Sequence, residues 1–462
     1  LEGGVKFDFS EISLPKDCLS QNNDINDESE LNEIEDTYDS DNDETKNVLQ
    51  ACFKSMVDTL SKQASETITQ VQLLVKELRR IILLWDELWL GTLAQHHSEI
   101  TKRQQQLELE IEKVNENLHL STEEKISLIS EKHRIIIKPI IFILEQLNDI
   151  TSVEPETPHE KQFQERYSEV IEDVLKKLKN PENPDKPQES WKLLKQLQNQ
   201  FQQKAHKRTL LKMHDISPVL ANIKDTVISM PGQALRTKVH ISHVSNHVNI
   251  LPTKTKPKKL VFHGSDGHTY TYLFKGLEDL HLDERIMQFL SIANTMMAQN
   301  TEGTGHNLYR ARHYSVIPLG PRSGLISWVG GTTPVFALYK RWQQREAAKN
   351  SKNSANAILR PSELFYNKLN PLLQEHGVKN LENRKEWPLA VLKQVLTELM
   401  DETPNDLLAK ELWCHAVNPG AWWQMVRKYS YSVAVMNIIG YIIGLGDRHL
   451  DNVLVDLNSG EV

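Results

Sequence analysis

Cysteine is scarce in this chain, which has three in 462 residues. Cys18, Cys52 and Cys414 lie far apart and fit no metal-ligand spacing, so a reducing compartment is the simplest interpretation. No apolar run reaches the roughly 18–20 residues of a membrane span, and no signal-peptide pattern is present. We therefore expect a soluble, cytoplasmic protein without a membrane partner, and a nuclear pool stays open.

Basic residues are missing from one stretch of the chain. Residues 24–44 hold eleven acids and no Lys or Arg. The formal net charge is −8, so the rest of the chain, without those eleven acids, carries +3. The overall acidity then says little about partners, and we expect residues 1–46 to be a solvated, disordered segment. Because the sequence starts at Leu1 and stops at Val462 after a Gly-Glu pair, we also expect it to be part of a longer protein.

Residues 47–215 show the apolar spacing of helices. Between Leu73 and Trp89, apolar residues recur at three- and four-residue steps, which predicts one apolar helix face. Ser121 and Thr157 each begin a capping-box pattern, and the prolines of 180–187 predict a loop. The region predicts an all-α bundle of four or more helices. We place a linker at 216–234.

The pattern changes to apolar–polar alternation near Val239. Alternating residues on both sides of 245–247 predict a hairpin, and the Asp-Gly within 264–267 predicts a second one. We expect an α+β fold with two lobes, a strand-rich lobe at 235–330 and a helix-rich lobe at 331–462. The other elements expected are strands at 258–262, 269–274, 314–319 and 325–329, and a helix at 282–298.

The segment 446–452, Gly-Asp-Arg-His-Leu-Asp-Asn, carries the most chemistry. It follows the apolar run 433–445 and precedes the apolar residues 453–455, as a loop between a helix and a strand would. Phosphoryl transfer needs an Asp to orient the attacking hydroxyl, cations to offset charge, and an Asn five residues after the Asp to hold magnesium. The alternative is a polar surface turn between two core elements.

Lys275 ends an apolar strand and is followed by acids, among them Glu278 and Asp283. A Lys in this place can reach nucleotide phosphates while a carboxylate holds it. The alternative is an exposed Lys beside a helix N-terminus, where acids are favoured by the helix dipole alone. No Gly-x-Gly-x-x-Gly loop is present, although Ser245 and the amides of its predicted turn could hold a phosphate.

Residues on or after the last strands of the first lobe could read an adenine through backbone groups and apolar side chains. They are Tyr314, Ile326, Trp328 and Val329, with ordinary strand core as the alternative. Short basic runs at 254–259 and around 341–345 could indicate nucleic-acid or phosphate binding, but such runs are usually solvated loops, which is the interpretation preferred here. We therefore expect no sequence-specific nucleic-acid binding.

Taken together, these motifs resemble the phosphatidylinositol-3-kinase-related protein kinases. The resemblance covers about 235–462 and is specific in wording at 250–259, at 276–290 and at 440–454. Within the family the wording is most like the member that acts in nonsense-mediated mRNA decay. The helical part resembles the rapamycin-binding-like four-helix domain that precedes the catalytic lobes of the family.

The resemblance implies ATP and Mg²⁺ as cofactors, with Mn²⁺ as an alternative metal. It implies that Asp447 orients or deprotonates a substrate hydroxyl, that His449 stabilises the transferring phosphoryl, and that Asn452 ligates the metal. It implies that Lys275 contacts the phosphates, with Glu278 and Asp283 as acidic partners. The residues implied to line the nucleotide pocket are Ser245, Leu273, Tyr314, Ile326, Trp328, Val329 and Leu454.

The implied activity is that of a serine/threonine protein kinase acting on Ser/Thr-Gln sites in mRNA decay and stress signalling. The implied partners are an up-frameshift-type RNA helicase, as substrate, and the regulatory subunits of a decay kinase complex. The family's second magnesium-binding Asp follows the Gly-Glu-Val turn, so we expect this chain alone to be inactive. Two alternatives stay open, a phosphatidylinositol kinase and a non-catalytic pseudokinase scaffold.

Overall fold

A computed structural model gives the fold of the chain. It describes residues 51–52, 54–59, 62–233, 238–253, 255–300, 309–350, 359–378, 380–381 and 383–462. The predicted acidic segment 1–46 lies outside the described residues. Within the described ranges, no helix is both long and apolar enough to cross a membrane.

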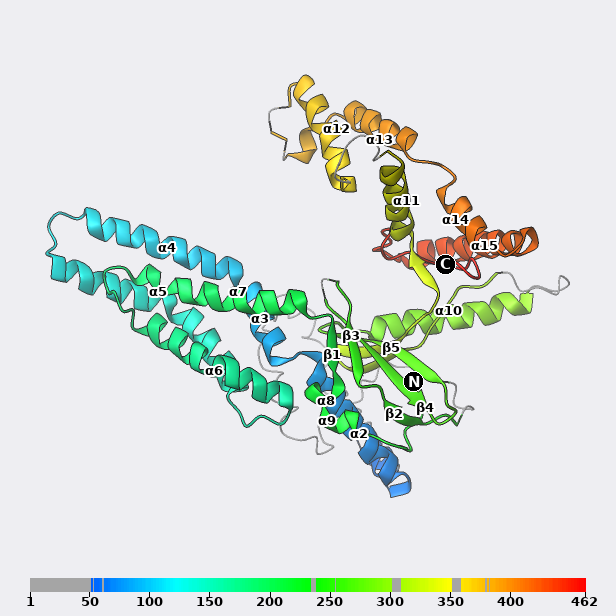
Figure 1. Ribbon diagram of the computed structural model, residues 1–462, viewed down its shortest axis with the longest axis horizontal. Coiled ribbons are helices and arrows are strands. Elements are labelled where there is room, and N and C mark those ends of the chain that lie inside the picture. The colour runs from blue at the N-terminus through cyan, green and yellow to red at the C-terminus, as the bar shows by residue number, and fades with distance from the viewer. Residues whose placement is uncertain are drawn as a thin grey trace, which may run out of the picture.

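Five helices form a bundle that projects from the rest of the molecule as a long arm (Figure 1). They are α3 (Trp85–Gln95), α4 (His97–Glu116), α5 (Thr122–Thr151), α6 (Pro158–Lys179) and α7 (Trp191–Lys207). Their core is rich in rings, and Phe163 and Phe201 stack in parallel with centroids 6.1 Å apart. Both predicted capping boxes are present, because Ser121 and Thr157 accept hydrogen bonds from the N–H groups of Glu124 and Glu160. The bundle therefore begins its helices where the sequence indicates.

The predicted apolar face at 73–89 belongs to two helices rather than one. α2 (Ser65–Ile82) ends just before Leu83 and Leu84, whose backbones are extended, and α3 then begins. Leu78 of α2 is buried against the sheet, whereas Trp89 of α3 is buried in the bundle core. Helical periodicity alone does not reveal such a corner, because each half keeps its own apolar stripe.

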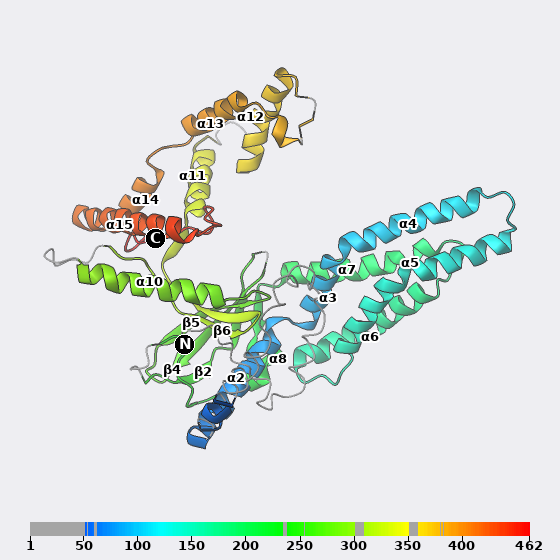
Figure 2. The ribbon, with the colours of Figure 1, turned by 180° about the vertical axis from the view of Figure 1, so that it is seen from behind.

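A seven-stranded antiparallel sheet forms the first lobe, in the order β1-β3-β4-β5-β7-β6, with β2 also paired to β4. α2 lies along one face of it, and α10 (His281–Asn300) lies on the side of the second lobe (Figure 2). The hairpin β4–β5 confirms the predicted strand pair, and β6 and β7, which were predicted as strands only, pair as a further hairpin. The strands are β1 (Leu210–Lys212), β2 (Ile241–Val244), β3 (His247–Ile250), β4 (Lys258–Gly264), β5 (Thr269–Gly276), β6 (Val316–Gly320) and β7 (Ser323–Ser327).

The hairpin predicted around 245–247 is wrong. β2 and β3 both pair with β4 and follow one line along it. Val244 pairs with Phe262, and Asn249 pairs with Lys259. The first chain segment therefore advances five residues while β4 advances three, and the extra residues, 245–246, form a bulge. The polar residues 245–247 bend the strand because Asn246 is bonded to the chain before it. Its side chain accepts a hydrogen bond from the N–H of His214, and its carbonyl accepts one from the N–H of Met213.

The segment predicted as a linker, 216–234, contributes to the sheet core. The short helices α8 (Met213–Ile216) and α9 (Pro218–Ala221) pack beneath the strands, and Leu220 is fully buried. Farther along, the N–H of Met230 donates to the carbonyl of Val239. The two neighbouring domain boundaries, at 215 and 235, remain predictions.

The second lobe is mainly helical, as expected. It contains α11 (Val335–Asn350), α12 (Pro361–Glu375), α13 (Leu389–Glu402), α14 (Leu407–His415), α15 (Pro419–Ile443) and the strand pair β8 (Thr332–Pro334) and β9 (Leu454–Asp456). α12 and α13 share a small core of their own. α15 contacts α10 through a cluster that includes Leu290 and Val435, so the lobes touch at that point as well as through the chain crossover at 328–334.

The contact between α2 and the sheet predicts a response to one added methyl group. A Cβ at Gly276 would collide with the Ile82 side chain of α2, so we expect Gly276→Ala to destabilise the sheet lobe by about 1–3 kcal/mol. Gly91 in α3 has no neighbour within 4 Å of a built Cβ, so Gly91→Ala should be neutral or stabilising by up to about 1 kcal/mol. Amide exchange of β5 and α3 across a urea series measures both. Equal behaviour of the two variants would contradict the packing described.

The bundle core also predicts a pH dependence. His133 is buried, its Nε2 accepts a hydrogen bond from Trp191 Nε1 at 3.3 Å, and burial lowers its pKa to about 4. The unfolded chain takes up this proton near pH 6.5, so the contribution to stability is present above that pH and is lost between pH 6.5 and 4. We expect the urea midpoint of the bundle to fall over this range, and to fall less in His133→Gln, which keeps an acceptor but does not titrate. Identical declines would contradict the assignment.

Candidate active site

The loop at 444–453 is anchored at both ends. α15 ends at Gly444, which has φ +66°, and the N–H of Leu445 donates back to the carbonyl of Gly440 at 2.8 Å. On the far side, Phe336 N–H donates to the carbonyl of Leu450 at 3.0 Å, and β9 pairs with β8. The loop is therefore fixed to the segment that crosses between the lobes, as its predicted helix–loop–strand setting requires.

Asp447 and Asn452 are in direct contact. Asn452 Nδ2 donates to Asp447 Oδ2 at 2.9 Å and to the Asp447 carbonyl at 3.0 Å. Asp447 has φ +57°, a left-handed conformation that costs a non-glycine residue about 1–3 kcal/mol and that gathers at functional sites. Because Asn452 makes these bonds through its nitrogen, its Oδ1 is the atom suited to a metal.

His449 faces the same carboxylate. Its Nε2 lies 3.8 Å from Asp447 Oδ1, and its Nδ1 accepts from the N–H of Asp451 at 3.3 Å. The neutral ring therefore carries its proton on Nε2, the nitrogen on the Asp447 side. Arg448 turns back on the loop, where its Nε donates to the Gly446 carbonyl at 2.8 Å, which fits a bracing role.

The second half of the site lies on the sheet. Lys275, near the end of β5, is half-buried, and its Nζ donates to Glu278 Oε2 at 3.1 Å. Between them Leu277 has φ +64°, which is unusual for leucine and turns the chain sharply after the strand. The predicted pairing of Lys275 with Glu278 is thus present. Asp283, the other predicted partner, is exposed in the first turn of α10.

Lys275 shares the face of the sheet opposite to α2. Tyr272 and Phe274 are buried toward α2, so alternation puts Leu273 and Lys275 on the other face. Leu273 lies directly opposite Ile326 of β7. The predicted pocket residues Leu273 and Ile326 are therefore neighbours on one half-buried face.

The crossover after β7 provides an aromatic ring and a backbone donor. Lys259 Nζ lies 4.2 Å from the ring centroid of Trp328, which is 40% exposed. The N–H of Trp328 donates to the Thr271 carbonyl at 2.9 Å. In the part of the chain that is described, the N–H of Val329 makes no hydrogen bond, so it could read a base. Leu454 is 42% exposed and is paired with Pro334 at the end of the crossover.

Tyr314 marks where the two halves meet. Burial raises the pKa of its hydroxyl, the charge of Asp283 raises it further, and the charge of Arg448 opposes this. Tyr314 is 37% exposed, so it is only partly buried. The predicted role of Asp283 toward Lys275 stays a prediction.

One ion pair near the site was not predicted. Arg312 Nη1 donates to Asp456 Oδ2 at 2.7 Å, joining the segment before β6 to β9. Burial acts to raise the pKa of Asp456, but the bond from Arg312 and the N–H of Asn458 outweigh it and lower the pKa. Asp456 directly follows the expected 453–455 strand, yet its partner is 144 positions away, and the sequence offers no signal for that pairing.

Ser245 is not at the tip of a turn. Its N–H donates to the Val261 carbonyl at 2.8 Å, so it lies within the sheet. The next connection along the chain, 251–257, does turn between paired strands, because it joins β3 to β4, and the structure describes it at 251–253 and 255–257. This loop, with Thr253, Thr255 and Lys256, is the better candidate for holding phosphate, and the basic run at 254–259 was its signal in the sequence.

No group of three or more His, Cys, Asp or Glu side chains is placed to hold a metal ion among the residues that the structure describes. Asn452 and Asp447 could supply one or two oxygens. Magnesium is commonly bound in this way, by one or two protein oxygens together with substrate phosphates and water. The residues present thus fit a metal that arrives with a phosphorylated ligand.

Comparison with known proteins gives consistent relationships. The phosphatidylinositol 3- and 4-kinase family matches residues 269–462. Serine/threonine-protein kinase SMG1 of Danio rerio is 49% identical over 431 residues, covering 91% of this chain and 12% of the relative. Smg1 of Drosophila melanogaster is 47% identical over 424 residues, covering 89% of this chain and 13% of the relative. Serine/threonine-protein kinase TOR of Oryza sativa is 28% identical over 418 residues, covering 89% of this chain and 15% of the relative. The chain thus spans a small part of the length of these relatives.

Proposed function

Because the chain belongs to the phosphatidylinositol-3-kinase-related protein kinases, we propose that it carries the ATP-binding and phosphoryl-transfer site of a serine/threonine protein kinase. One observation carries this proposal. Asp447 and Asn452 are hydrogen-bonded to each other in a loop anchored to the crossover, at 2.9 Å between their side chains. The Lys275–Glu278 pair, on the sheet that precedes the same crossover, supports it.

The groups available fit ATP with a divalent cation. Lys275 offers a positive charge for phosphate oxygens, and Glu278 holds it in place. Trp328 and the N–H of Val329 offer a flat face and a donor for the base, with Leu273, Ile326 and Leu454 nearby. Asn452 Oδ1 would hold Mg²⁺, or Mn²⁺ as the alternative. The nucleotide supplies the transferable phosphoryl group, and the metal neutralises its charge.

Asp447 acts on the substrate hydroxyl in this proposal. Its bond from Asn452 fixes the carboxylate, which orients the hydroxyl and can take its proton. His449 presents the Nε2 side of its ring toward the same carboxylate, from which it can donate to the transferring phosphoryl. Arg448 braces the loop.

The finer proposals rest on the resemblance and on relatives named SMG1 at up to 49% identity. We propose Ser/Thr-Gln sites as substrates, an up-frameshift-type RNA helicase as the main one, and a role in nonsense-mediated mRNA decay and stress signalling. Regulatory subunits of a decay kinase complex and a cytoplasmic location with a nuclear pool belong to the same proposal.

A phosphatidylinositol kinase is the second candidate, because the matching family includes lipid kinases by its description. We expect the native protein, purified from the cells that make it, to phosphorylate a Ser-Gln peptide, to lose most activity when Gln is replaced by Ala, and to leave phosphatidylinositol vesicles unmodified. Incorporation of phosphate into the lipid and not the peptide would favour the second candidate.

Replacing Asp447 by Asn tests the chemical role directly. Loss of a general base typically lowers the rate by about 10²–10⁴-fold, so Asp447→Asn in the native protein should lose peptide phosphorylation to that extent. ATP binding should persist, because Lys275 and the crossover are untouched. Asp451→Asn on the same exposed loop is the control and should retain activity. Full peptide phosphorylation by the Asp447→Asn protein would contradict the role assigned to Asp447.

A further inference from the structure

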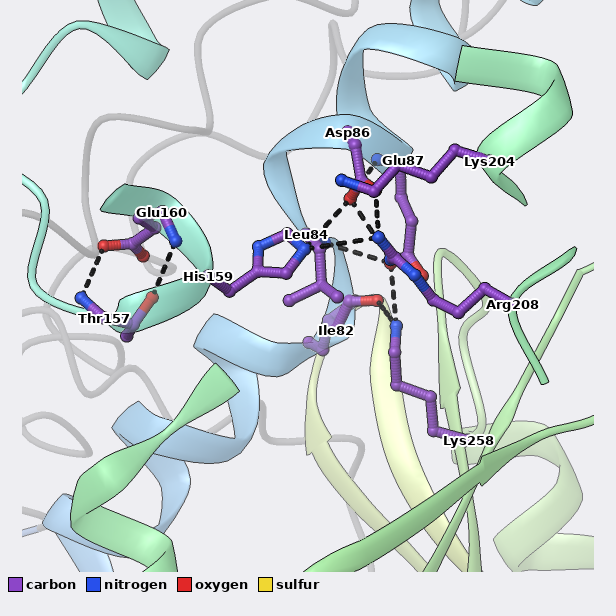
Figure 3. Close-up of polar contacts among 10 residues, drawn as sticks. All are labelled: Ile82, Leu84, Asp86, Glu87, Thr157, His159, Glu160, Lys204, Arg208 and Lys258. Carbon is purple, nitrogen blue, oxygen red and sulfur yellow. Dashed lines mark hydrogen bonds and ion pairs between the residues drawn. The ribbon is translucent and has the colours of Figure 1, made fainter. Parts of the chain in front are cut away.

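The corner between α2 and α3 is held by a lysine that belongs to the sheet. Lys258, the first residue of β4, is 3% exposed, and its Nζ donates to the Ile82 carbonyl at 2.9 Å and to Glu87 Oε2 at 2.8 Å (Figure 3). Ile82 ends α2, where carbonyls lack partners within the helix and the dipole favours a cation. Glu87 lies in the first turn of α3 and also accepts the N–H of Leu84 at 3.0 Å. Lys258 therefore ties two helices to one strand.

Glu87 moves with the bundle because α3 is bound to α7. Asp86, beside Glu87, is buried and forms an ion pair with Arg208, and Lys204 Nζ lies 3.7 Å from the same carboxylate (Figure 3). Burial acts to raise the pKa of Asp86, but the neighbouring Arg208, His159 and Lys204 together outweigh it and lower the pKa. Asp86 therefore stays charged, and α3 and α7 are held together at the base of the bundle.

Lys258 is also the residue that closes the 251–257 loop. The N–H of Leu251 donates to the Pro257 carbonyl at 3.0 Å, so the loop ends immediately before Lys258. The next residue, Lys259, points to the opposite face, toward Trp328. Lys258 therefore connects the loop to the bundle, whereas Lys259 connects β4 to the crossover.

A cavity of about 260 Å³ lies between the bundle and this loop. Gly91 and Ala94 of α3 line one side, and Thr255 and Lys256 of the loop line the other. Since a cavity separates these parts, close packing does not fix the loop there. The Lys258–Glu87 ion pair is a direct charged link across the junction.

We propose that Lys258 is a positioning residue through which the helical bundle fixes the 251–257 loop and so sets the affinity of the site for the triphosphate of ATP. This inference rests on the proposed function. It assigns the bundle a regulatory role, in which a partner that displaces the bundle changes nucleotide affinity without touching the site.

The test is a double variant, Lys258→Met with Glu87→Gln, in this chain. It leaves no unpaired buried charge, and Gln keeps an acceptor for the N–H of Leu84, so the fold should persist. Coupling between sites is typically worth about 5–150-fold in affinity, so we expect the Kd for a fluorescent ATP analogue to rise at least about fivefold. The Kd for the matching adenosine analogue should stay unchanged, because Lys259 and Trp328 are intact. Lys258→Arg, which keeps the charge and leaves Glu87 in place, should bind ATP more tightly than the double variant.

Lys132→Met provides the matched control, because its partner Glu110 lies in the bundle and not at the junction. It should leave both affinities unchanged. If the wild-type chain binds no ATP, the proposed function fails. If it binds ATP and the double variant binds ATP equally well, the positioning role is overturned. Equal weakening for ATP and adenosine would also overturn it, since a general loss of structure would act on both.

Discussion

The buried ammonium of Lys258 is the constraint on which the arrangement of the first lobe depends. It lies where α2 ends and α3 begins. An ammonium group only donates hydrogen bonds, so each of the two helices must present an acceptor oxygen to it. The corner directs α2 along one face of the sheet and sends α3 into the bundle. Because α2 covers one face, Lys275 lies on the other face of the sheet.

The two halves of the site share a physical character. Each includes a non-glycine residue with a left-handed backbone, Leu277 beside Lys275 and Asp447 in the anchored loop. Such conformations persist only where surrounding contacts impose them. Hydrogen bonds of the loop to the α15 terminus and to the crossover do so for Asp447. Polar groups are therefore held in place before any ligand arrives, which is what phosphoryl transfer by positioning requires.

Local patterns in the sequence predicted what is local in the structure. The capping boxes at Ser121 and Thr157, the β4–β5 hairpin and the pairing of Lys275 with Glu278 arise within a few residues. The bulge at 245–246 was missed because a bent strand and a hairpin show the same alternation, and only the partner strand distinguishes them. The Arg312–Asp456 pair and the Lys258 corner join residues more than 140 positions apart, and no spacing rule reaches that far.

The central claim is that Lys275 faces the phosphates of ATP. An ATP analogue with an acyl group on its terminal phosphate transfers that group to a lysine held beside the phosphates, and mass spectrometry of the labelled peptides identifies the lysine. The account predicts labelling at Lys275, with surface lysines such as Lys113 labelled little, and suppression of the Lys275 label by excess ATP. Labelling spread over exposed lysines, or undiminished by ATP, would contradict it.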